Sequence, residues 1–189
     1  MMIRKTLAAF AFAGTMAVLT PCATAQTPPP PPPAMAKVQA SAYVMAAGRS
    51  DLYEINSSQI AVKKSTSPQV RAFANMLIKH HQQTTAATMK AAAKAGLTPA
   101  APSLDAGAAA SIRELQTASA ADFDRVYLAQ QVPAHEAALD LHQSYAKGGD
   151  QAPLRTSAKA AIPIVKQHLD AAKRLHSNGG GGHSGHGNK

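Results

Sequence analysis

Three histidines are the side chains of this sequence that are best placed to do chemistry. His81, His135 and His168 each stand inside a long segment of helical periodicity and share a stripe with apolar residues. The segment of His135 also has a second apolar face, through Phe123, Tyr127 and Leu141. The spacing predicts that the imidazoles point inward. The shared stripes are Val70, Ala74, Leu77, Thr84 and Thr88 for His81, Leu128, Val132 and Leu139 for His135, and Leu154, Ala158, Ala161, Val165, Ala172 and Leu175 for His168.

These histidines are also expected at one level of the molecule. In a bundle whose helices alternate up, down, up and down, the turns before His81 and His168 lie at the same end. At about 1.5 Å per residue, all three histidines then lie roughly 16 to 22 Å from that end. Glu54, on the first predicted helix, reaches nearly the same level. Glu54, His81, His135 and His168 are therefore predicted to converge in the middle of the bundle.

Two interpretations of this cluster stay open. The first is a structural network in which the histidines donate hydrogen bonds to Glu54, Asp51 or hydroxyls such as that of Thr84. The second is a site for a single transition-metal ion, because imidazoles with one carboxylate suit zinc, copper or iron. A di-iron carboxylate centre needs Glu-x-x-His on two helices. That pattern occurs nowhere in the sequence, which argues against a ferroxidase-like site.

The other residues that could bind a metal ion or act in catalysis are less well placed. His142 and His176 are expected near helix ends on the surface, and His183 and His186 fall in a Gly-rich tail that would bind metal only loosely. No nucleophile motif such as Gly-x-Ser-x-Gly occurs. The sequence therefore predicts no catalytic residue and no cofactor beyond the metal ion of the second interpretation.

The elements that position these residues are predicted to be helices throughout. Helical segments are expected over residues 35–64, 67–96, 106–116, 119–146 and 153–176. Ser67 caps the second segment with Pro68 at its first position, and Gly96 closes it. Ser119 and Asp122 have the spacing of a capping box. We expect the all-α class: a ferritin-like, up-down-up-down four-helix bundle with a short extra helix between the second and third long helices.

The two ends of the chain are predicted to lie outside this bundle. Basic residues, an apolar run and the triplet Ala23-Thr24-Ala25 give residues 1–25 the layout of a signal peptide. Removal of that segment takes Cys22, the one cysteine of the chain, with it. Residues 26–36 form a Pro-rich linker, residues 37–176 the bundle domain, and residues 177–189 a Gly/His-rich tail without apolar residues, which predicts disorder.

The net charge and the predicted export limit the kinds of partner that we expect. The net charge is +9, and the lysines and arginines are dispersed with few aromatic residues among them. An exported protein of this kind is not expected to bind nucleic acid, and the mature chain is expected to contain no transmembrane helix. The envelope surface or another protein is the expected partner, and the expected location is periplasmic or associated with the outer membrane.

Three segments of the sequence resemble one known family. They are residues 67–81, which end in His80 and His81, residues 123–136, which contain His135, and residues 162–169, which contain His168. Together they are similar to the bacterial domain-of-unknown-function 4142 family across roughly residues 38–175. The resemblance implies an exported, ferritin-like bundle and histidines at the positions of His81, His135 and His168. His80 stands where the family usually has aspartate, and Ala134 where an acidic residue is common.

Two classes of function follow. The leading hypothesis is an exported, non-enzymatic helical bundle that binds a partner or surface and supports the envelope under stress. The alternative is a metal-binding or redox protein that uses Glu54, His81, His135 and His168.

Overall fold

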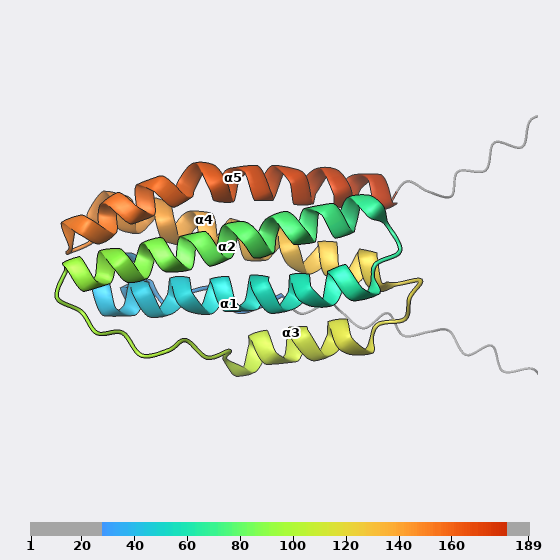
Figure 1. Cartoon of the computed structure of the whole chain (residues 1–189), viewed down its shortest axis with the longest axis horizontal. Coiled ribbons are helices and arrows are strands. Elements are labelled where there is room, and N and C mark those ends of the chain that lie inside the picture. Colours follow the sequence, from blue (N-terminus) through green and yellow to red (C-terminus); the bar gives the residue numbers. More distant parts are fainter. Residues whose placement is uncertain (1–27, 181–189) are drawn as a thin grey trace, which may run out of the picture.

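The protein is a bundle of helices that run along its long axis (Figure 1). The computed structural model describes residues 28–180, and every regular element in that range is helical. A short 3-10 helix, η1, precedes five α-helices. The predicted all-α class is confirmed, and no helix in the described range is long and apolar enough to cross a membrane. The elements are η1 Ala34–Lys37, α1 Ala40–Lys64, α2 Pro68–Lys94, α3 Ala106–Thr117, α4 Phe123–Gly148 and α5 Ala152–Gly180.

The ends of α2 follow from local side-chain chemistry. The Ser67 hydroxyl accepts a hydrogen bond from the Val70 N–H at 3.3 Å, with Pro68 at the first helical position. Gly96 has φ 74°, the left-handed conformation that favours glycine after a helix. In that conformation the Leu97 N–H donates to the Ala92 carbonyl at 3.0 Å. The predicted cap, start and stop of this helix are confirmed.

Three predicted boundaries differ from the observed ones. The first helix is broken at Val38 and Gln39, because the Val38 carbonyl accepts from the Asp150 N–H at 3.0 Å and anchors the chain to the turn before α5. Ser119 does accept from the Asp122 N–H at 3.1 Å, but residues 120–122 form a turn and α4 begins at Phe123. Helix α5 continues to Gly180, so residues 177–180 belong to a helix and not to a disordered tail.

The direction of the helices corrects the predicted topology. Tyr43 contacts His142 and Ser58 contacts Tyr127, so α1 and α4 run antiparallel. The α1–α2 turn and the α4–α5 turn lie at opposite ends of the bundle (Figure 1). The long helices therefore run up, down, down and up, where up, down, up and down was expected. The physical reason is residues 95–122, which are long enough to carry α3 back along the bundle before α4 starts.

The hydrophobic core is divided in two by a polar layer. One cluster contains Phe73, Leu115, Phe123 and Tyr127, and the other contains Tyr43, Leu141, Tyr145 and Leu154. Along each of the four long helices, buried polar residues lie between these two clusters or within the adjoining part of the first one. Burial of polar groups is costly unless each one is satisfied, so this layer calls for an explanation. Its members include Asp51, Glu54, Ser57, His81, Thr84, Gln131, His135 and His168.

The proline run lies against the bundle and is not a free spacer. Residues 28–33 have no regular secondary structure, and Pro29 to Pro33 help to line a cavity of about 250 Å³ with residues of α1, α3 and α4. A Cβ on Gly107 would lie 2.6 Å from the Pro30 Cδ, so a glycine is required for this contact. The signal-peptide prediction and His183 and His186 of the tail fall outside the described residues.

Candidate metal centre

The structure brings His81, His135 and His168 together in the polar layer. They lie near the middles of α2, α4 and α5, and their exposed fractions are 3%, 1% and 0%. Their ring centroids are 5.1 to 5.8 Å apart. One ring nitrogen of each histidine lies within 4.8 Å of those of the other two. The assumed topology was wrong, but the predicted convergence does not depend on it, because the middle of a helix lies mid-bundle whichever way the helix runs.

One nitrogen of each imidazole is engaged by a neighbouring group. His81 Nδ1 lies 2.8 Å from Asp51 Oδ1, and His135 Nδ1 lies 2.8 Å from the Gln131 carbonyl oxygen. His168 Nε2 lies 2.8 Å from His80 Nδ1, and the two rings stack. Carboxylate and carbonyl oxygens can only accept, so the Nδ1 atoms of His81 and His135 carry the protons. These contacts orient the three rings.

The second nitrogen of each imidazole is buried without a partner. His81 Nε2, His135 Nε2 and His168 Nδ1 make no hydrogen bond in the described part of the chain. Neutral His81 and His135 have lone pairs at these atoms, because their protons are on Nδ1. A buried acceptor that stays unpaired costs about 1 to 3 kcal/mol. The space between the three rings therefore lacks the cation or the hydrogen-bond donors that would satisfy these nitrogens.

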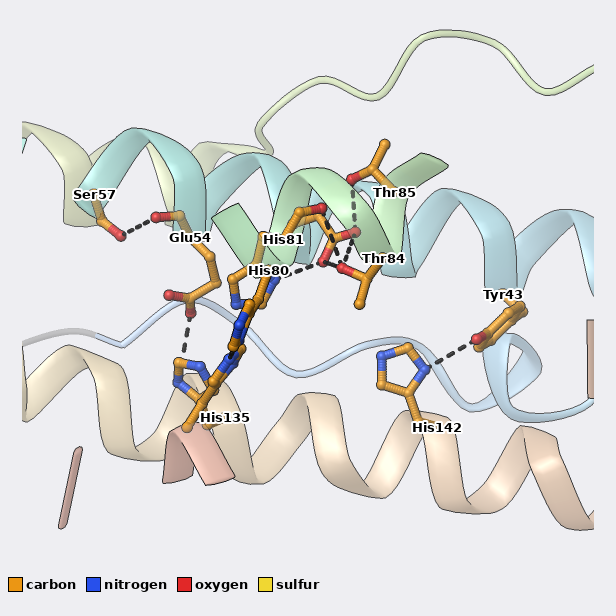
Figure 2. A network of polar contacts seen from close by, with 11 residues as sticks. Tyr43, Glu54, Ser57, His80, His81, Thr84, Thr85, His135 and His142 are labelled. Atoms are coloured by element: carbon orange, nitrogen blue, oxygen red, sulfur yellow. Dashed lines mark hydrogen bonds and ion pairs between the residues drawn. The ribbon is translucent and has the colours of Figure 1, made fainter. Parts of the chain in front are cut away.

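Asp51 holds the ring of His81 in its orientation. Besides the contact with His81, its two carboxylate oxygens accept hydrogen bonds from the Thr84 hydroxyl at 3.2 and 3.1 Å and from the Thr85 hydroxyl at 2.7 Å. Figure 2 shows Thr84 and Thr85 on one side of His81. Burial acts to lower the pKa of His81, but the hydrogen bond and charge of Asp51 outweigh it, and the pKa is raised.

Glu54 lies beside the three histidines and does not complete their group. Its Oε1 is 3.9 Å from His135 Nδ1, the nitrogen that already donates to the Gln131 carbonyl (Figure 2). Both Glu54 oxygens are buried and accept no hydrogen bond from residues 28–180, and the same holds for Gln131 Oε1. Burial raises the pKa of the Glu54 carboxyl to about 7, against the opposing effects of His81 and Gln131. This carboxyl is therefore close to half protonated at neutral pH.

Burial keeps the other two core histidines neutral. It lowers the pKa of His135 to about 3 and that of His168 to about 2, and the neighbouring charge of His81 adds to both effects. Neutral imidazole is the form that binds metal ions. Two of the three rings are thus in the ligating form throughout the ordinary pH range.

Several residues of this site were missed or misplaced by the sequence. His80 was noted only as a departure from the family pattern, yet it is the hydrogen-bond partner of His168. His142, expected on the surface, is 6% exposed and lies 3.0 Å from the Tyr43 hydroxyl, because α1 packs over that part of α4. Burial lowers the pKa of His142 to about 4. His176 is exposed as predicted.

The chain is similar to one protein family and to one group of solved structures. The family described as domain of unknown function (DUF4142) matches residues 24–175, as the sequence motifs indicated. The solved structure of CopM in its Cu(II)-bound form has 15% identity and a TM-score of 0.64, over 74% of this chain and 97% of that one. The Ag-bound form has a TM-score of 0.62 and the Cu(I)-bound form 0.61, at 15% and 14% identity.

At this identity the likeness establishes a shared fold. Each of those two further forms covers 74% of this chain and 96% of its own. No curated protein matches the sequence.

Proposed function

The chain belongs to the family of the domain of unknown function DUF4142, and we propose that it binds a single transition-metal ion through His81, His135 and His168. One observation carries the proposal. Three buried imidazoles from three helices each have one nitrogen held by a neighbour and one nitrogen without a partner. Ligating histidines in metalloproteins have this pattern, since the outer N–H donates to a carboxylate, carbonyl or similar acceptor while the inner nitrogen binds the metal.

His80 completes the pattern at the third ring. When His168 Nε2–H donates to His80 Nδ1, the lone pair of His168 is on Nδ1, its unpartnered nitrogen. When His81 is neutral, three lone pairs then belong to one cluster, and no group of the described residues donates a hydrogen bond to them. A structural network would need N–H or O–H groups at these positions, and a cation satisfies all three nitrogens at once.

Copper is the ion that we propose. Three imidazoles without a thiolate suit copper, zinc, iron or nickel, and among divalent ions such a site binds copper most tightly. CopM, which has the same fold, has been solved in Cu(II)-, Cu(I)- and Ag-bound forms. Glu54 was expected as a fourth ligand; we propose instead that its buried carboxylate balances the charge of the ion from beside His135.

The proposal also includes a fold family and a location for the protein. A single long crossover between the second and third long helices is typical of ferritin-like bundles, and we assign the protein to them. The segment layout of residues 1–25 supports export to the periplasm or the outer membrane. In this reading the protein is a non-enzymatic copper-binding protein of the cell envelope.

Calorimetric titration with Cu(II) tests the central claim. The reference protein is the chain with His183→Ala and His186→Ala, so that the tail histidines contribute nothing to the measured binding. We expect one ion per chain in the reference and no stoichiometric binding after His81→Ala or His168→Ala. The matched control is His142→Gln, which removes another buried histidine, outside the cluster, and should leave binding intact. Equal binding by all variants, or none by the reference, would refute the proposal.

A further inference from the structure

The central histidines differ in how they connect to the surface. The outer nitrogens of His81 and His135 contact Asp51 and the Gln131 carbonyl, and both of those residues are buried. The outer nitrogen of His168 instead contacts His80, which is only half-buried. Among the described residues, the contact between His168 and His80 thus links a ring of the cluster directly to a side chain that reaches the surface.

A cavity lies on the same side of the bundle as this contact. It has a volume of about 180 Å³ and lies between α2 and α5, with Thr84 and Ile164 in its lining. Thr84 follows His80 by one helical turn, and Ile164 precedes His168 by one turn. Gln83, Ala87 and Ala160 also line the cavity and are exposed, so it opens to solvent. The alanines of the lining, Ala87, Ala160 and Ala161, have small side chains, and the cavity lies one helical turn from His80 and His168, which are not in its lining.

We infer that His80 is the ligand through which copper ions enter and leave the central site, by way of the seam between α2 and α5. The inference rests on the metal site proposed above. His80 Nδ1 is held by His168, and its Nε2 has no partner within the described residues, so that nitrogen is available to an arriving ion. The rings of His80 and His168 are stacked with centroids 5.1 Å apart. An ion bound by His80 is therefore separated from the site by the contact between this ring and a ligand ring.

A simpler role for His80 predicts a different behaviour. If His80 only accepts the His168 N–H, it fixes the tautomer of His168 and thereby the affinity, and a side chain that accepts the same hydrogen bond should leave both rate constants unchanged. Glutamine at this position separates the two roles. Its side-chain carbonyl can accept the same hydrogen bond, but an amide binds copper poorly compared with an imidazole.

Stopped-flow fluorescence makes the comparison. The chain has four tyrosines and no tryptophan, so quenching of tyrosine emission by Cu(II) reports binding, and a chelator in excess reports release. The reference protein again has His183→Ala and His186→Ala. We compare it with the same chain carrying His80→Gln, His80→Ala or, as matched control, His176→Gln, an exposed histidine farther along α5.

In His80→Gln we expect both rate constants to fall, by about tenfold or more and by much more than Kd changes. In His80→Ala the affinity should fall as well, by about 10- to 100-fold, because the partner of His168 is lost. The control should match the reference. Unchanged rates in His80→Gln overturn the inference and leave the metal site standing. Absence of copper binding by the reference protein overturns both.

Discussion

His81 and Asp51 form a buried pair in which Nδ1 lies 2.8 Å from Oδ1, and this pair decides which nitrogen of His81 is free. The carboxylate accepts the Nδ1 hydrogen bond, so the lone pair of the neutral ring is on Nε2, which has no partner among the described residues. Two threonine hydroxyls hold the carboxylate in place from α2. A helix that carries no metal ligand in this cluster, α1, thus orients the ligand of its neighbour.

Asp51→Asn is expected to weaken copper binding by about 10- to 100-fold, as loss of an outer partner of a ligating histidine does. It should also lower the free energy of unfolding by about 1 to 3 kcal/mol, since the amide brings donors to a position where Thr84 and Thr85 already donate. Titration calorimetry and urea unfolding measure the two effects. Asp140→Asn is the matched control, because Asp140 pairs with Lys37 on the surface and should change neither by much.

Glu54→Gln is expected to change how stability of the metal-free protein depends on pH. Burial raises the pKa of Glu54 from 4.5 to about 7, so between these values the folded state binds a proton that the unfolded state has lost. Ionisation of Glu54 therefore lowers stability as pH rises through this window, by at most about 3 kcal/mol. The glutamine variant should be the more stable protein at pH 8 and lose that advantage below pH 4.5. Urea unfolding at several pH values measures this, and an equal difference at every pH would contradict it.

The neutral histidines are expected to make the metal-free protein sensitive to acid. The pKa values of His135 and His142 are lowered to about 3 and about 4, whereas both histidines titrate near 6.5 in the unfolded chain. The unfolded state therefore takes up protons first, and stability falls as pH drops below about 6.5. His142→Gln should reduce the slope of the unfolding free energy against pH between pH 6.5 and 4. The reduction should correspond to about one proton fewer taken up on unfolding. His176→Gln, at an exposed site, should leave the slope unchanged.

Gly107 and Gly148 form a matched pair for testing the contact of the proline run. Both are helical, and alanine in place of a helical glycine stabilises by about 0.5 to 1 kcal/mol where there is room. A Cβ at Gly148 meets nothing within 4 Å, but one at Gly107 meets Pro30 at 2.6 Å. Thermal unfolding should show a higher Tm for Gly148→Ala and a smaller gain or a loss for Gly107→Ala. Equal gains at both positions would mean that Pro30 does not pack there in solution.

Much of the fold could be determined from sequence because its signals are local. The cap at Ser67, the stop at Gly96 and the inward stripes of His81 and His168 each depend on neighbours within a turn or two. The three histidines lie at one level because each is near the middle of its helix, and that position can also be read from the local sequence. These features do not require knowledge of which helix packs on which.

Only the tertiary structure decided what depends on contacts between helices. The reversal of α4 is caused by the path of residues 95–122, which no periodicity encodes. The free nitrogen of each histidine is set by Asp51 and His80 from other helices and by the Gln131 carbonyl within α4. The burial of His142 depends on α1 lying over it. Hydrogen bonds between side chains far apart in sequence have no counterpart in the pattern of a single helix, so the chemistry of the site appears only once the helices are packed.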